Sequence, residues 1–356
     1  MQPSTAKVTA ATEGRALRPL HRFRNLRALA WHGDVLFASQ GYSLLQAQVT
    51  AGAVEWEIVG SFRPEFWRAL STSNRLSFRL FREGFHALAI LPTGHIIAAV
   101  PGVIITLAPG ETEFRVSHRI ERGTRPLHIA STPNGRLFWG EYFDNRDRDE
   151  VHIYGSHDGG LTWDVAYTFI KGTVRHVHNI VYDQWEDCLW ILMGDYGTEC
   201  QILRASLDLR AMDVVLSGTQ QARAAALIPM RDAIYFSSDT PLESNHIYRL
   251  TRNGAVSKVA NIAGPSIYGC RVGNSLLFST MVEPRQRGMS KDVTIYRSND
   301  GLQWNELLRW KKDFWPMRLF QYGNAFLPDG NNESGLLAVS TLGVIEDDLA
   351  TTIWRI

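Results

Sequence analysis

The chain has 356 residues, of which 45% are hydrophobic and 11% aromatic, so it can bury a sizeable core. The formal net charge of +1 gives no overall reason to expect nucleic acid or an anionic membrane as a partner. Three widely spaced cysteines follow no metal-binding pattern and are expected to be reduced. No segment has the apolar length of a signal peptide or a membrane span. We therefore expect a cytoplasmic protein, or a secreted one if a signal peptide has been removed.

Strand signals dominate the chain and fall into units of roughly 40–50 residues, the repeat length of β-propellers. The first strands of these units open with LRALAWHG, FHALAILPTGH, LHIASTPNGR, VHNIVYDQWED, ARAAALIPMRD, IYGCRVGNS and MRLFQYGN. More apolar second strands follow, such as RLFWGEY and CLWILMGD. A four-stranded module cannot bury both of its faces alone, so the units should close into a ring. The sequence predicts an all-β fold, a seven-bladed propeller with four-stranded antiparallel blades, as a single domain over residues 1–356.

The two ends of the chain predict how the ring closes. The last unit stops at TTIWRI, which supplies a third strand but no fourth. Leu17–Arg24, before the first unit, has the pattern of outer strands elsewhere, such as Val165–Ile170. We expect this N-terminal strand to complete the last blade.

Residues 64–84 interrupt the strand rhythm. The segment opens with Pro64, and its apolar residues predict a partly helical insertion between the first two blades. Its arginines, Arg75, Arg79 and Arg82, are expected to be solvated.

Two short motifs predict tight turns between third and fourth strands. Residues 156–163, SHDGGLTW, match the pattern S-x-D-x-G-x-T-W, and residues 298–304, SNDGLQW, are a shorter copy without the threonine. Asp158 should accept hydrogen bonds from turn amides, and Gly160 should permit the turn. The motifs resemble the Asp boxes, or BNR repeats, of sialidase-like β-propellers, where such turns lie opposite the active face. The resemblance implies that Asp158 and Asp300 are structural.

The stretch RHVHNIVYDQWEDCLWILMGD, residues 175–195, predicts a hairpin with chemically active groups at one end. Its second strand returns to the start of the first, so His176, His178 and Asp195 should lie near one surface. An ordinary hairpin with polar ends is the alternative. The recurrence of this pattern along the chain favours a functional role.

Alignment of the first strands places one residue of each unit in a common column: Arg27, His86, His128, His178, Arg223, Tyr268 and Arg318. First strands line the central channel of a propeller, and their starts share a face with the loops after the second strands. Those loops supply Glu141, Tyr142, Asp195, Glu199, Asp239 and Glu283. Packing alone would select small or apolar residues in this column. We therefore predict a binding site at the channel mouth, with a water-filled polar channel as the alternative.

The first candidate function for this site is elimination across an acidic glycan. Removal of the proton α to a uronate carboxylate needs a fixed positive charge, assigned to Arg223, and groups that transfer protons, assigned to His128 and His178. Tyr268 or Tyr142 would assist at the leaving oxygen. The other members would bind substrate: Arg27, His86, Arg318, Glu141, Asp195, Asp239 and Glu283. The arrangement resembles propeller-type polysaccharide lyases, ulvan lyases among them, which implies an acidic oligo- or polysaccharide as partner.

The second candidate is a divalent metal site, the one cofactor the sequence points to. Residues i and i+2 of a strand share a face, so both rings of an H-x-H pair could bind one ion. The candidate ligands are His86, His128, His176 and His178. The chain is also similar to the seven-bladed oligogalacturonate lyases, which use a histidine-bound metal, although the Asp boxes depart from that lineage.

The third candidate is a sialidase-type or metal-dependent hydrolase, or a propeller that binds glycans without catalysis. Three column arginines and Tyr268 near Glu283 are similar to the arginine triad and the Tyr–Glu pair of sialidases. No Arg-Ile-Pro motif stands near the N-terminus, however, and an arginine triad does not call for three histidines. Binding therefore ranks second to elimination, and hydrolysis third.

Overall fold

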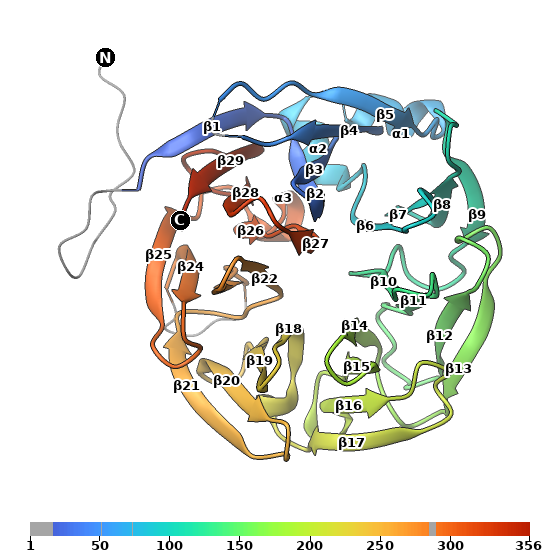
Figure 1. Ribbon diagram of the computed structural model, residues 1–356, viewed down its shortest axis with the longest axis vertical. Coiled ribbons are helices and arrows are strands. Elements are labelled where there is room, and N and C mark those ends of the chain that lie inside the picture. Colours follow the sequence, from blue (N-terminus) through green and yellow to red (C-terminus); the bar gives the residue numbers. More distant parts are fainter. Residues whose placement is uncertain (1–16, 51, 73, 285–289) are drawn as a thin grey trace.

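Seven blades stand in a ring in the computed structural model, which describes residues 17–50, 52–72, 74–284 and 290–356 (Figure 1). The first strands of the blades are β2 (Arg27–Gly33), β6 (Ala87–Ile90), β10 (Ala130–Ser131), β14 (Val177–Asp183), β18 (Ala224–Pro229), β22 (Tyr268–Val272) and β26 (Asn324–Phe326). The second strands are β3 (Val35–Gln40), β7 (Ile96–Val100), β11 (Leu137–Gly140), β15 (Cys188–Met193), β19 (Ala233–Ser238), β23 (Ser275–Ser279) and β28 (Leu336–Leu342). The predicted seven-bladed propeller is confirmed.

The outer half of each blade consists of a third strand, which is largely buried, and a fourth strand, which is partly exposed to solvent. The third strands are β4 (Ser43–Gln48), β8 (Val103–Leu107), β12 (Val151–Ser156), β16 (Gln201–Ala205), β20 (Asn245–Thr251), β24 (Asp292–Ser298) and β29 (Ala350–Arg355). The outer strands are β5 (Glu57–Ser61), β9 (Arg115–Arg119), β13 (Asp164–Phe169), β17 (Met212–Ser217), β21 (Val256–Ile262), β25 (Asn305–Lys311) and β1 (Pro19–Arg24).

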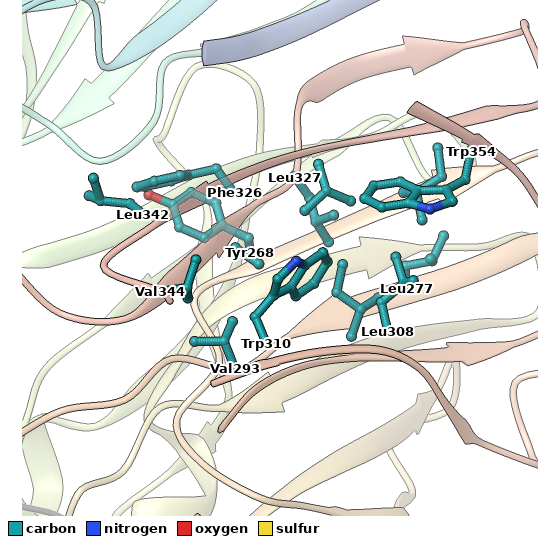
Figure 2. Packing of buried hydrophobic residues seen from close by; sticks show 14 of the residues in the cluster. Tyr268, Leu277, Val293, Leu308, Trp310, Phe326, Leu327, Leu342, Val344 and Trp354 are labelled. Atoms are coloured by element: carbon teal, nitrogen blue, oxygen red, sulfur yellow. The ribbon is translucent and has the colours of Figure 1, made fainter. Parts of the chain in front are cut away.

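The hydrophobic core lies between neighbouring blades. Every residue of β7 and of β15 is buried, because a second strand has a blade packed on each of its faces. Figure 2 shows one such layer between the last two blades, where the ring centroids of Trp310 and Trp354 lie 6.0 Å apart beside Leu277 and Leu308. This stacking fixes the innermost strands around the axis, and with them the side chains at the channel mouth.

The ring closes as the sequence predicted. β1 pairs antiparallel with β29, from Pro19 opposite Trp354 to Arg24 opposite Ala350. The chain then turns at Asn25, whose φ is 57°, and enters the first blade as β2. The N-terminal strand is thus the fourth strand of the last blade (Figure 1).

A short strand that the sequence did not predict forms a second link between the first and last blades. β27 (Asp329–Asn332) follows β26 of the last blade but pairs parallel with β2 of the first, from Ala30 opposite Asp329 to Gly33 opposite Asn332. It lies on the axis side of β2 and brings Asp329 to the channel.

The two predicted turns have the expected hydrogen bonds. The Asp158 carboxylate accepts from the amides of Leu161 and Thr162, each at 3.0 Å, and Asp300 accepts from Leu302 and Gln303, each at 2.8 Å. These turns join third to fourth strands. In a meander whose first strands begin at the channel mouth, such turns lie on the opposite face of the ring.

Three short helices lie in connections that lead into first strands, and therefore on the same face as the channel mouth. α1 (Phe66–Ser71) and α2 (Arg75–Phe81) precede β6, and α3 (Met317–Phe320) precedes β26. Arg79 is fully buried between α2 and α3, where it pairs with Asp313 and donates to the Phe320 carbonyl, so its predicted solvation is wrong. None of the helices in the described part of the chain has the length and apolar character needed to cross a membrane.

Candidate functional site

Six of the seven residues predicted as a column lie at the starts of innermost strands. Arg27 and Tyr268 begin β2 and β22, His178 is the second residue of β14, and the others come just before their strands: His86, His128 and Arg223. Arg318 is not in the column. It lies exposed on α3, and the innermost strand of the last blade begins only at Asn324. Pro316 opens a helical turn there, so the segment MRLF, predicted as a strand, never enters the sheet.

The column residues divide into two clusters. The first, the histidine–aspartate cluster, consists of His176, His178 and Asp195 with Arg175 and Arg223. The second, the channel cluster, consists of Arg27, His86, Arg125, His128, Tyr268 and Asp329. The predicted metal ligands are accordingly separated, because His86 and His128 belong to the channel cluster and do not join the His176–His178 pair.

Two irregularities of the chain assemble the histidine–aspartate cluster. Val177 is opposite Met193 and Asn179 is opposite Leu192, so His178 is an extra residue that bulges from the β14–β15 ladder. Gly194 adopts φ +83°, and a Cβ atom there would lie 1.7 Å from the Glu199 carbonyl oxygen. Only glycine fits this sharp turn, which brings Asp195 back over the bulge.

The three side chains of this cluster are buried and converge on one point. The Nε2 atoms of His176 and His178 lie 3.0 Å apart, and Asp195 Oδ1 lies 3.3 Å from His178 Nε2 and 3.6 Å from His176 Nε2. The opposite ring nitrogens face backbone carbonyls. Nδ1 of His176 is 2.9 Å from the Phe143 oxygen, and Nδ1 of His178 is 2.9 Å from the Ala224 oxygen.

Two arginines fix the Asp195 carboxylate. Arg175 Nη1 lies 3.0 Å from Oδ2, and Arg223 Nη2 lies 3.2 Å from Oδ1. Burial alone would raise the pKa of Asp195, but its contacts with His176 and His178 outweigh this effect and hold that pKa below its ordinary value. Asp195 is therefore an anion at any working pH. Burial also lowers the pKa of His178, although Asp195 acts to raise it.

A tyrosine and further carboxyl groups border this cluster. The Tyr142 ring lies 4.3 Å from the His176 ring between centroids, and burial raises the Tyr142 pKa above its ordinary value. Asp239 lies 3.8 Å from Arg223. Burial raises the pKa of Asp239 well above its ordinary value, although Arg223 opposes the rise, and the nearby Glu283 and Asp195 add to it. Arg223 is thus already surrounded by carboxyl groups.

The channel cluster joins blades that are not neighbours. His128 comes before β10 in the third blade, and its ring lies 5.9 Å from that of Tyr268 in the sixth. His128 Nδ1 lies 3.0 Å from Asp329 Oδ2, which reaches the channel on β27. The first-strand side chains therefore meet across the axis.

Two arginines give the channel cluster a positive end. Arg27 lies over the Phe326 ring, 4.1 Å from its centroid, and within 3.5 Å of His86 Nδ1. Burial lowers the pKa of Arg27, and burial together with the Arg27 charge lowers the pKa of Arg125 to about 10. The same burial and the charges of Arg125 and Arg27 hold the pKa of His86 well below its ordinary value, so its ring is neutral.

Unpartnered polar atoms lie on this positive side of the channel. Within the described residues, Arg27 Nε and His86 Nε2 are buried without a hydrogen-bond partner, and no carboxylate lies within ion-pair distance of Arg27 or Arg125. Buried donors without partners are costly, so this end of the cluster is short of an anion or of an acceptor.

Glu141 and Glu199, predicted at the mouth, each pair with an arginine outside both clusters. The Glu141 carboxylate accepts from Arg122 Nε at 2.9 Å and from the His152 amide at 2.8 Å. Glu199 forms a two-pronged pair with Arg148, at 2.6 and 3.0 Å. Each carboxylate fixes a loop at the rim of the channel.

Sequence reasoning missed three members of the clusters. Arg175 stands next to the H-x-H motif and Arg125 three residues before His128. An alignment extended by a few residues before each first strand would have included both. Asp329 had no signal, because the DGNN segment that forms β27 is polar and rich in turn residues.

Comparisons with known proteins support the fold but give no information on the site. No model of a known protein family matches the chain, and no curated protein matches it by sequence. Among solved structures, the chain is similar to one in "Crystal Structure of Mitotic Checkpoint Complex", with a TM-score of 0.57 and 10% identity over 100% of this chain and 99% of that chain. It is also similar to one in "Structural and Mechanistic Analysis of Two Prolyl Endopeptidases: Role of Inter-Domain Dynamics in Catalysis and Specificity", with a TM-score of 0.56 and 9% identity over 91% of this chain and 47% of that chain. Likeness at this level of identity establishes the propeller fold alone.

Proposed function

We propose that the channel mouth binds an acidic oligo- or polysaccharide and cleaves it by elimination at a uronate residue. The observation that carries this proposal is the pair Arg27 and Arg125, two guanidinium groups in a desolvated setting with no carboxylate paired to them among the described residues. A substrate carboxylate would offset their mutual repulsion and would accept from the unpartnered Arg27 Nε.

This assignment differs from the sequence-based hypothesis, which gave the neutralising role to Arg223. Arg223 already faces Asp195 at 3.2 Å and Asp239 at 3.8 Å, so a third carboxylate there would meet repulsion. Among the described residues, Arg27 and Arg125 have no carboxylate within ion-pair distance, although Asp329 and Glu83 lie near enough to act on their pKa values.

The proton transfers are assigned to neighbours of these arginines. Nδ1 of His128 donates to Asp329, which leaves Nε2 of the neutral ring as the base for the proton α to the uronate carboxylate. As that proton leaves, a carbon–carbon double bond forms and the bond from the β carbon to the glycosidic oxygen breaks. Tyr268 donates a proton to the departing oxygen. Burial raises the pKa of Tyr268, so its hydroxyl is protonated at neutral pH.

A panel of acidic polysaccharides, followed by near-ultraviolet absorbance, tests the proposal. Elimination creates a double bond conjugated with the carboxylate, whereas hydrolysis and binding create none. With a cleaved substrate in hand, His128→Ala should reduce turnover about 10²–10⁴-fold, as expected for loss of a general base. His157→Ala, in an exposed turn on the opposite face, is the matched control and should leave the rate unchanged.

The arginines are tested by substitutions that keep the charge. Arg27→Lys and Arg125→Lys lose the two-pronged geometry and should mainly raise KM, whereas Arg210→Lys, an exposed arginine on a β16–β17 turn, should not. Binding of a glycan without any absorbance change would replace elimination by simple recognition. No affinity for any acidic glycan in the panel would refute both.

A further inference from the structure

We infer that His176, His178 and Asp195 form a tetrahedral binding site for a zinc-class divalent cation. The inference is independent of the proposed elimination, whose residues lie in the channel cluster. It rests on the positions of three ligand atoms and on where the protons of the two imidazole rings must be.

The three atoms have the spacing of one face of a tetrahedral metal centre. Their separations are 3.0 Å between the two Nε2 atoms and 3.3 and 3.6 Å from these to Asp195 Oδ1. A tetrahedral zinc ion with bonds of 2.0–2.1 Å holds its ligand atoms about 3.3 Å apart. All three residues are at least nine-tenths buried, so the spacing does not depend on flexible surface side chains.

The assignment of the ring protons leaves no hydrogen atom at the centre of this triangle. The carbonyl oxygens of Phe143 and Ala224 can only accept, so each Nδ1 carries the ring proton of its histidine. The Nε2 atoms of the neutral rings are then bare lone pairs, and Asp195 is an acceptor as well. Three acceptors within 3.6 Å of one another repel unless a cation lies between them.

The groups around the three ligands hold them in place, as in a preformed metal site. A backbone carbonyl on Nδ1 is the usual partner that orients a metal-binding histidine through its other nitrogen. Asp195 is fixed by Arg175, and its amide and carbonyl are held by Glu199 and Gln220. Rigid ligands of this kind favour a preformed site.

The neighbouring charges suit a divalent ion. Arg175 is shared between Asp195 and Asp144, and Arg223 is shared between Asp195 and Asp239. Asp195 therefore has neither guanidinium to itself, and its carboxylate can offer charge to a divalent cation.

A second set of metal-type ligands on the opposite face does not carry the same argument. Asp183, Glu186 and Cys188 lie together, but Arg252 pairs with both Asp183 and Glu186. Its guanidinium already supplies the positive charge that a metal would bring.

The test uses full-length protein purified without a histidine tag and stripped with a chelator. Calorimetric titration with Zn²⁺ should show one site per chain, and Co²⁺ should give the intense visible bands of tetrahedral coordination. His176→Gln and Asp195→Asn should each weaken Zn²⁺ binding by at least ~100-fold, the upper cost of losing even an outer-shell partner. His246→Gln, a partly buried histidine on β20, is the matched control and should bind normally.

Nitrogen NMR of the histidine rings distinguishes a metal from a shared proton. The metal site requires both Nε2 signals to shift on addition of Zn²⁺ to the stripped protein. An imidazolium at His176 or His178 at neutral pH, unchanged by Zn²⁺ and accompanied by no binding heat, would overturn the inference. These wild-type measurements decide the question even if the variants fail to fold, and they use no glycan, so failure of the proposed elimination would not affect them.

Discussion

Single polar residues, placed where blades meet, also join neighbouring blades. Asp183 ends β14 and is fully buried, where it accepts from the Trp190 indole at 3.0 Å and pairs with Arg252 of the next blade. Burial alone would raise the pKa of Asp183, but Arg252 and Trp190 outweigh it and lower that pKa. One carboxylate thus joins the fourth blade to the fifth.

We predict that Asp183→Asn lowers the free energy of unfolding at pH 7 by on the order of 2 kcal/mol, the value of a hydrogen bond to a charged group. Because the folded pKa lies below the unfolded one, this stabilisation is full above the unfolded pKa and disappears as pH falls through the folded pKa. Urea unfolding at pH 7 and near pH 3 should therefore show a larger difference from wild type at the higher pH. Asp164→Asn, at an exposed position, is the control. An equal loss at both pH values would contradict the ionic explanation.

At the scale of elements, the turns between third and fourth strands also act as contacts between blades. Gly301 adopts φ +72°, and a Cβ atom there would lie 2.1 Å from the Tyr235 hydroxyl of the preceding blade. Gly160 makes the same kind of approach to Ile97, at 2.6 Å. These glycines serve the turn and the packing of neighbouring blades at once.

Gly301→Ala should therefore destabilise the protein by more than the loss of a left-handed glycine alone explains. Gly110→Ala is the matched control, because Gly110 has φ +82° but open space around its Cβ position. We expect about 1–2 kcal/mol of destabilisation at Gly110, from backbone strain, and roughly 1–3 kcal/mol more at Gly301, from the clash. Adding Tyr235→Ala should remove part of the excess in a double-mutant cycle. Equal losses at the two glycines would show that the contact between blades is unimportant.

The elements predicted from the sequence are those with a strong local signal. β15 is a continuous apolar run, and the Asp158 turn has a defined residue at nearly every position, so both were found. β27 and α3 were missed because their structure depends on distant partners. β27 is polar and becomes a strand only beside β2, and the segment around Arg318 alternates like a strand yet turns into a helix after Pro316.

The candidate site was predictable in composition but not in arrangement. The column alignment found His128, His178, Arg27 and Tyr268 because each occupies the same position in its repeat. It could not show that His128 reaches across the axis to Asp329, or that Arg223 is held by Asp195. Such pairings depend on side-chain length and on the width of the closed ring, which no single repeat contains.

At the scale of the whole molecule, stability depends on closure of the ring. β1 covers the edge of β29, and without it a third strand would present unpaired amides and carbonyls to solvent. The contact of Phe23 with Trp56, 5.4 Å between ring centroids, also ties this seam to the first blade.

A chain that begins at Leu26 should consequently unfold several degrees lower than one that begins at Leu17 and retains β1, a loss of at least ~2 kcal/mol for a domain of this size. It should also associate through the uncovered edge. Differential scanning calorimetry and size-exclusion chromatography of the two chains measure these effects. Identical melting curves and elution volumes would show that β1 is dispensable.

The two strand pairings that close the ring, β2 with β27 and β1 with β29, also set an order of events during synthesis. The first blade emerges from the ribosome early, but its inner edge receives β27 only after residues 329–332 have been made. The last blade, in turn, is completed by β1, which is synthesised before the first blade. Neither terminal blade can be completed before the other is made, so the final step of folding joins segments 299 residues apart at β2–β27 and at least 326 residues apart at β1–β29, which is intrinsically slow. The same two pairings make the finished ring slow to open, because β27 must leave β2 and β1 must leave β29 before either blade is released.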